Sequence, residues 1–257
     1  MNSAFLTATS SRTQRPGGAC LPAVRSYIVP VKLPTEVPVM TLPNATLFPQ
    51  ALLPLYIFEP CYRQMLADVL HTNRMFAVAL QKPGRTREAP APVAGLGVVR
   101  VSVGHKDGTS HLVLQGIVRV ELKETLRYKP YRLQRIQVLE APPADSPAVD
   151  ALVAQVREVL AERLQLGLPY PFLSLGGKDA DEEGPPPCSE FVARDMLEYV
   201  GSLKNPEYVA DLVSCAVLRG SERRQTILET LDIETRLRRL ILFLLAEIRE
   251  HRGTKHE

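Results

Sequence analysis

Hydrophobic periodicity divides the chain into a strand-rich part and a helix-rich part. Between Val37 and Glu140, apolar residues occur in short runs or alternate with polar residues, which is typical of strands. After Pro147 they recur every three or four residues, as they do along one face of a helix. The pattern predicts a β-structure at about 37–141 and an α-helical subdomain at about 147–250.

The strand-rich part is repeatedly interrupted by turn signals. The segments LPLYIF (53–58) and MFAVALQ (75–81) read as fully buried strands. Asp107 and Gly108 predict a hairpin turn, because type I′ turns need residues that accept positive φ. Gly116 interrupts the following strand and predicts a bulge or a tight bend. Many short strands with bulges indicate a small, irregular barrel.

One helix is predicted inside this barrel. Pro60 suits its first turn, where no amide hydrogen is needed, and Glu59 and Arg63 are spaced to pair across that turn. Its predicted apolar face consists of Tyr62, Met65, Leu66 and Val69. The residues predicted to enter the core just before it are Leu55, Ile57 and Phe58.

Capping residues locate the helices of the second part. Ser146 can cap the first helix and Pro147 can begin it. After a loop rich in proline, glycine and acids (168–188), further helices are predicted at 189–202, 206–217, 221–230 and from Ile233 to Glu250, the last with Asp232 as its N-cap.

Composition allows a substantial core: 45% of the 257 residues are hydrophobic and 23% are charged. No apolar run is long enough to cross a membrane. The net charge is +3, and residues 1–36 alone carry +3, so the rest of the chain is neutral, which disfavours non-specific nucleic-acid binding.

Residues 1–36 are predicted to be a disordered, non-structural extension, with an organellar presequence as the alternative. Four widely spaced cysteines fit packed thiols and a cytoplasmic location.

The segment VPVMTLPNATLFPQALLPLYIFEPCYRQML (37–66) resembles the opening of the N-terminal, substrate-binding domain of Lon proteases. The resemblance continues through GLGVVRV (95–101), LVLQGIVRVEL (112–122) and the helical region 205–248. It implies an α+β fold, in which a PUA-like irregular β-barrel with one inserted helix is followed by an α-helical subdomain. It also implies a role in binding protein substrates.

The chain departs from the family pattern in places that matter. Gln50 stands where the family often has glycine, which predicts a turn without positive φ, and Cys61 stands where an arginine is common. The sequence contains neither a GxxxxGK[ST] phosphate loop nor a GxSxG elbow. We therefore expect a stand-alone Lon-domain protein without the ATPase and Ser/Lys peptidase modules, which is not an enzyme and needs no cofactor.

Substrate binding requires an exposed apolar groove that accepts unfolded or extended polypeptide. The candidate groove residues are Leu47, Phe48, Leu52, Tyr56, Glu59, Tyr62 and Arg63. The alternative for the apolar members is that they fill the barrel core, and for Glu59 and Arg63 that they form a structural ion pair. We expect the protein to act as a substrate-recognition or adaptor factor in proteolysis or protein quality control. A protease is a further expected partner, and no interaction with a membrane is expected.

Two other functions remain open. The first is RNA binding, because basic residues around Tyr128 and Tyr131 give this region a local charge of +4; they are Arg119, Lys123, Arg127, Lys129, Arg132 and Arg135. The alternative for these residues is a solvated outer face of the barrel. The second is a cryptic hydrolase, for which the sequence offers only scattered candidates.

No metal site is predicted. His105 and His111 flank the hairpin turn, and with Asp107 and Gly108 at its centre their imidazoles would be diagonal neighbours, poorly placed for one metal. The acids between Asp179 and Glu183 are predicted to form a solvated loop rather than a calcium site.

Overall fold

The computed structural model describes residues 33–82, 84, 89–142, 146–168 and 189–254. The described residues from Pro34 onward belong to one compact unit. The predictions for the N-terminal extension up to residue 32 and for the acidic loop 179–183 lie outside the described residues.

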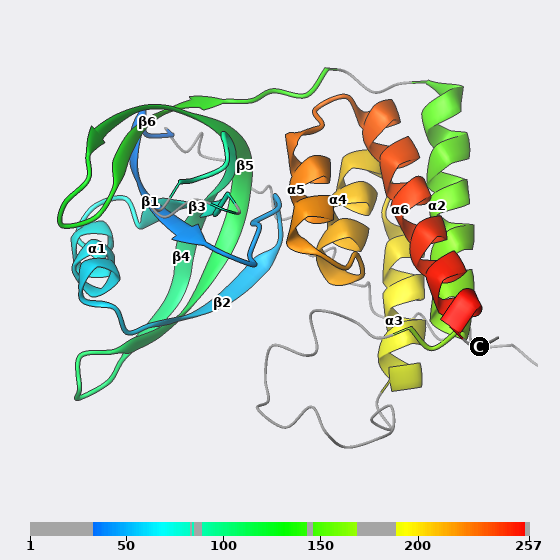
Figure 1. The fold of residues 1–257 in the computed structure, drawn as a ribbon, viewed down its shortest axis with the longest axis horizontal. Coiled ribbons are helices and arrows are strands. Elements are labelled where there is room, and N and C mark those ends of the chain that lie inside the picture. The colour runs from blue at the N-terminus through cyan, green and yellow to red at the C-terminus, as the bar shows by residue number, and fades with distance from the viewer. Residues whose placement is uncertain (1–32, 83, 85–88, 143–145, 169–188, 255–257) are drawn as a thin grey trace, which may run out of the picture. The chain divides into compact units, whose positions relative to one another are not determined.

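Six strands form one mixed sheet that closes into an irregular barrel (Figure 1). They are β1 (Glu36–Leu42), β2 (Leu52–Ile57), β3 (Met75–Leu80), β4 (Val93–Gly104), β5 (Ser110–Arg127) and β6 (Leu133–Val138). The strand order is β2-β5-β4-β3-β1-β6, and an additional β5–β6 pairing closes the ring and leaves β2 at an edge. Only β1 and β3 pair in parallel; the other pairs are antiparallel.

Two glycines let a loop approach the sheet closely. A side chain on Gly95 would meet the carbonyl oxygen of Leu47, and one on Gly116 would meet that of Phe48, each at 2.0 Å from the Cβ position. The amide of Gly116 also donates to the carbonyl of Ala51 at 2.9 Å. The ladder shifts register beside Gly116, which confirms the predicted bulge.

The prediction that 53–58 is a fully buried strand is wrong. Along β2, exposed residues alternate with more buried ones, because the strand lies at the edge of the barrel and only one face packs inward. Phe58 follows the strand and is 57% exposed, so it does not enter the core. By contrast, every residue of β3 is buried, as predicted for 75–80.

The inserted helix α1 (Pro60–Leu70) begins at the predicted proline and buries Met65, Leu66 and Val69. The turn before β2 differs from the prediction, because Gln50 has a φ of 64°. Its amide donates to the carbonyl of Gly116, so the turn geometry is fixed by the strand. The residue therefore adopts a left-handed conformation that glycine would adopt with less strain.

The helical part follows the predicted pattern. It contains α2 (Pro147–Gln165), α3 (Ser189–Ser202), α4 (Pro206–Ala216), α5 (Ser221–Glu229) and α6 (Ile233–Thr254), with α2 packed beside α6 (Figure 1). Ser146 accepts a hydrogen bond from the amide of Ala148 at 3.1 Å, and Asp232 accepts one from Thr235 at 2.8 Å. Both predicted N-caps are thus confirmed. None of the described helices has the length and apolarity needed to cross a membrane.

Two hydrophobic clusters make up the core, and consecutive residues reach both. Leu47 packs in the barrel cluster with Met40, Phe76 and Leu114. Phe48 packs instead among the helices, in the cluster that contains Val213 and Leu237. The loop after β1 therefore connects the interiors of the barrel and the helical part.

A buried charge network makes a second connection. Arg119 of β5 pairs with Asp211 of α4, and Arg236 of α6 lies 3.5 Å from the same carboxylate. Arg119 also donates to the carbonyl of Leu228 at 3.1 Å. These side chains are almost fully buried, so each charge depends on the others and on backbone carbonyls for its partners.

Candidate functional site

A groove of about 710 Å³ lies along the outer face of β2. Strands β2, β4 and β5 form one wall, and the segment after β1 together with α4 and α5 forms the other. We call it the β2 groove. Its lining consists of residues 44–47 and 51–56, Val101, Val103, residues 111–113, Cys215 and Arg224.

Strand pairing explains why the sheet side of the β2 groove is apolar. On the outer face, Tyr56 pairs with His111, which pairs in turn with Val103 on β4. One row further along, Pro54 pairs with Val113, which pairs with Val101. Pro54 is tolerated because β2 is an edge strand. Proline has no amide hydrogen to donate, and on the open side of an edge strand no neighbouring carbonyl needs that hydrogen bond.

These side chains remain accessible to a ligand. Tyr56 is 49% exposed and Val103 is 54% exposed, and Leu52 and Val101 are similarly open. Adjacent exposed apolar side chains on one face are uncommon on soluble proteins unless the face binds something.

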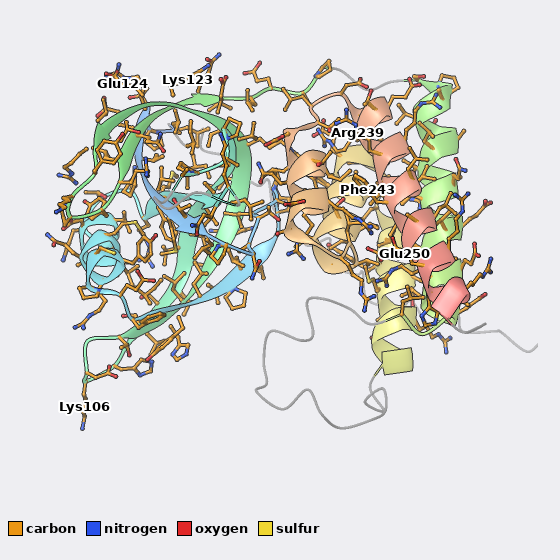
Figure 2. All side chains as sticks on the ribbon, viewed as in Figure 1. Lys106, Lys123, Glu124, Arg239, Phe243 and Glu250 are labelled. Carbon is orange, nitrogen blue, oxygen red and sulfur yellow. The ribbon has the colours of Figure 1, made fainter. Side chains whose placement is uncertain are left out.

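Aromatic rings continue from the β2 groove toward the tip of the β4–β5 hairpin. The ring of Tyr56 lies 5.8 Å from Phe58 and 4.7 Å from His111, measured between ring centroids. The Nε2 atom of His105 lies 2.7 Å from Nδ1 of His111, so one imidazole donates a hydrogen bond to the other. Figure 2 shows Lys106 at the tip of this hairpin, pointing away from the barrel.

The predicted turn centre at Asp107 and Gly108, with His111 opposite Gly104, is wrong. The hairpin has a three-residue loop: His105 donates its amide to Thr109 at 2.8 Å, and Gly108 donates to His105 at 3.0 Å. Gly108 has a φ of 80°, as expected for a type I turn that ends in a left-handed residue. The register therefore shifts by one residue from the predicted one and places His111 opposite Val103. Among the described residues, no third ligand-type side chain joins this pair in a group that could hold a metal.

The helix side of the β2 groove is more polar. Arg224 donates to the carbonyl of Asn44 at 2.9 Å and to that of Leu218 at 3.4 Å. Its Nε and the hydroxyl of Thr46 are buried without a hydrogen-bond partner. Burial lowers the pKa of Arg224 from its usual value, because the guanidinium loses water, whereas burial raises the pKa of the Cys215 thiol.

The predicted peptide-binding residues divide into two sets. Leu47, Leu52 and Tyr56 line the β2 groove. Phe48, Glu59, Tyr62 and Arg63 do not belong to its lining. Of the second set, Phe48 is fully buried among the helices, which leaves no surface for a ligand.

The other three residues of that set lie on or beside α1. The hydroxyl of Tyr62 is 3.3 Å from the amide of Thr41 and is partly buried. In the part of the chain that the structure describes, Glu59 and Arg63 form no ion pair with each other. Arg63 instead lies against Gly108, where its guanidinium would collide with any added side chain.

Half of the residues in the predicted basic surface are paired with acids. Arg119 is buried against Asp211 and is not part of the surface. Lys123 pairs with Glu121 at 2.5 Å, and Arg135 pairs with Glu36 and Glu124. Figure 2 shows Lys123 and Glu124 next to each other on the outside of the barrel.

The tyrosines of that region are engaged as well. Arg127 lies over the ring of Tyr131 at 4.8 Å, and Arg132 lies over Tyr128 at 5.1 Å. Tyr131 is buried and donates its hydroxyl to Asp68 at 2.7 Å, so its ring is not available to stack on a base. Lys129 precedes a cis peptide bond to Pro130.

Sequence reasoning missed several residues that line the groove. They are Thr46, Pro54, Val101, Val103, His111, Val113 and Arg224. For Val101 and Val103 the pattern was misleading, because strict alternation places them on the same face as Val99, which is buried in the barrel core. A register shift between Val99 and Val101 precedes the two exposed valines. For Arg224 there was no signal, since its helix is polar on most sides and only tertiary packing brings it to β2.

Comparisons with known proteins agree with this architecture. The model of the ATP-dependent protease La (LON) substrate-binding domain matches residues 36–246. The Lon protease of Desulfosudis oleivorans is 23% identical over 81% of this chain and 24% of its own length. The Lon protease of Anaeromyxobacter dehalogenans is 27% identical over 95% of this chain and 27% of its own length. The chain thus spans about a quarter of these relatives.

Solved structures share the fold. The N-terminal domain of a Lon protease of the Mycobacterium avium complex aligns with a TM-score of 0.60 at 19% identity, covering 81% of this chain and 97% of that domain. A Lon N-terminal domain protein from Xanthomonas campestris aligns with a TM-score of 0.56 at 18% identity, covering 81% and 98%. Together with the match over 36–246, these findings show that the chain belongs to the Lon substrate-binding domain family.

Proposed function

We propose that the chain binds unfolded or extended polypeptide in the β2 groove, as a non-catalytic substrate-recognition or adaptor factor in proteolysis. The observation that carries this proposal is the exposed apolar face of β2, β4 and β5, where Tyr56 and Val103 flank His111 in one cross-strand row and Val101 lies in the next row. Such a face gains free energy when it buries apolar side chains of a ligand, at about 25 cal/mol for each Å².

The shape of the site supports an extended ligand. The two cross-strand rows lie two residues apart along each strand, which corresponds to about 7 Å. Side chains at positions i and i+2 of an extended peptide point to the same side at the same spacing. Family membership adds support, because the matching family is described as a substrate-binding domain.

The RNA alternative has weaker support. Three of its six residues are ion-paired with acids, and Arg119 among them is buried. We therefore treat RNA binding as an outcome of the experiment rather than as a second proposal. A cytoplasmic location remains part of the proposal, in keeping with Cys61 and Cys215, which are both thiols.

The test is fluorescence anisotropy with the full chain, a labelled unfolded protein and a labelled single-stranded RNA, each at low and high salt. We expect binding of the unfolded protein that persists at high salt, because apolar contacts are not screened. Replacing Tyr56 and Val103 by serine should weaken this binding at least tenfold, a loss of about 1.4 kcal/mol.

A matched control is Leu242→Ser. Leu242 is 65% exposed on α6 and does not line the β2 groove, so its loss should leave the affinity unchanged. Equal loss in both variants would refute the assignment of the groove. Salt-sensitive binding of RNA alone would replace the proposed function.

A further inference from the structure

The β2 groove combines an apolar wall with one uncompensated positive charge. Among the described residues that line it, Arg224 is the sole Lys, Arg, Asp or Glu. Its two hydrogen bonds both go to backbone carbonyls, those of Asn44 and Leu218. A guanidinium has five N–H donors, so it can still bind an anion.

Three fully buried arginines in the same molecule have a carboxylate partner that the half-buried Arg224 lacks. Arg119 and Arg236 share the carboxylate of Asp211, and Arg163 pairs with Glu247 at 3.0 Å. Buried charges are normally compensated in this way, because removing a charge from water is costly. Among the described residues, no carboxylate forms an ion pair with Arg224.

A second observation marks the same wall. Thr46 lines the groove beside this arginine, is more than nine-tenths buried, and has a hydroxyl without a hydrogen-bond partner. The Nε of Arg224 is also unsatisfied. Buried polar atoms without a partner are uncommon in folded proteins, and these two belong to side chains that both line the groove.

We infer that the β2 groove selects extended segments in which apolar side chains are accompanied by an acidic side chain, whose carboxylate binds Arg224. This inference rests on the proposed function and specifies its substrate class. The apolar side chains lie on the rows of Tyr56 and Pro54, and the carboxylate lies toward the helices. A guanidinium and a carboxylate form a strong, charge-assisted hydrogen bond in such a partly desolvated place.

The open form of the groove favours an acidic side chain over a chain terminus. Leu52 and Tyr56, four residues apart along β2, are each about half exposed, so a bound chain can contact the strand over this length. A site for a terminal carboxylate would instead be closed at one end. The occupant is therefore an internal segment with aspartate or glutamate next to its apolar residues.

The experiment uses the full chain and labelled peptides in which leucine alternates with serine. One peptide carries glutamate before the apolar stretch, one carries it after, and their counterparts carry glutamine; all are amidated at the C-terminus. The better glutamate peptide should bind about tenfold more tightly than its glutamine counterpart at about 50 mM salt, which corresponds to about 1.4 kcal/mol. This preference should shrink at high salt, because screening weakens the ion pair.

Variants test whether Arg224 is responsible. Arg224→Gln should abolish the preference for glutamate over glutamine, and Arg224→Lys should keep part of that preference. The matched control is Arg157→Gln, since Arg157 is also half-buried, donates to the carbonyl of Leu203, and has an unsatisfied Nε, but lies outside the groove. That variant should keep the full preference. If Arg224→Gln fails to fold, as judged by circular dichroism, comparison of the glutamate and glutamine peptides with the wild-type protein still tests the preference for an acidic side chain.

The possible outcomes separate the two proposals. If no peptide and no unfolded protein binds, the proposed function fails and this inference fails with it. If glutamate and glutamine peptides bind equally well, peptide binding stands and the acidic specificity is overturned. If a glutamine peptide with a free C-terminal carboxylate gains affinity while the amidated glutamate peptides do not, the site recognises a chain terminus, which also overturns the inference.

Discussion

Asp211 offers the sharpest test of how the barrel and the helices are held together. Its carboxylate lies between the guanidinium groups of Arg119 and Arg236, and all three side chains are buried. The substitution Asp211→Asn keeps the shape of the side chain but removes its charge. Two buried cations would then remain without a carboxylate.

The expected loss follows from this charge count. Breaking a buried ion pair by removing one partner costs about 3–5 kcal/mol. Three backbone carbonyls stay in place as acceptors for the two arginines, those of Leu228, Thr230 and Leu231. We therefore expect a loss of about 3 kcal/mol, a large share of the total stability of about 5–15 kcal/mol that is usual for a folded domain.

The assay is urea unfolding of the full chain at pH 7, followed by far-ultraviolet circular dichroism. The matched control is Asp195→Asn, which removes an exposed acid from α3 and should change the free energy of unfolding by less than about 0.5 kcal/mol. Arg119→Met should be less harmful in the Asp211→Asn background than in the wild-type protein, because it removes one of the two repelling cations. A loss below about 1 kcal/mol for Asp211→Asn would refute this account of the network.

Three further substitutions test other features. Phe48→Ala empties a fully buried position among the helices and should lower the free energy of unfolding by about 3–5 kcal/mol in urea; a smaller loss than for Leu242→Ala would contradict its place in the core. Gln50→Gly relieves a positive φ and should raise stability by about 0.5–1 kcal/mol, whereas a decrease in the melting temperature would show that the turn is not strained. Asp232→Ala removes the N-cap of α6 and should cost about 1 kcal/mol at pH 7. Because hydrogen bonds from Thr235 lower the pKa of Asp232 in the folded state, its contribution is present above the unfolded pKa and lost as the pH falls through the folded one. The melting temperatures of the wild-type protein and Asp232→Ala should therefore converge as the pH falls. A difference in melting temperature that stays constant with pH would contradict the capping role of the Asp232 carboxylate.

The helices were predictable from local chemistry. Ser146 and Asp232 are N-caps whose side chains bond the first turn, and Pro60 and Pro147 occupy positions where no amide hydrogen is needed. Each of these features involves residues within four positions of one another, so it does not depend on the rest of the fold. The β-rich part was recognisable as an irregular barrel for the same reason, since bulges and turn residues are local as well.

The site was less predictable, because it depends on which face of a strand the barrel covers. Leu47 and Phe48 are equally apolar in the sequence, yet one enters the barrel and the other enters the helical part. The edge position of β2 exposes Tyr56, which a buried strand would have hidden. Likewise, Arg135 of β6 pairs with Glu36 of β1 and Glu124 of β5, and a charge count over 119–135 alone could not include Glu36.

The contacts that Phe48 and Arg119 make with the helical part have a consequence for synthesis of the chain on the ribosome. When a ribosome has completed β6, the partners of Phe48 and Arg119 on α4, α5 and α6 have not yet been synthesised. Until they emerge, the nascent barrel presents a bare phenylalanine and an arginine that only water can solvate. The surroundings of Phe48 and Arg119 are therefore completed only late in translation, after the barrel strands have been synthesised.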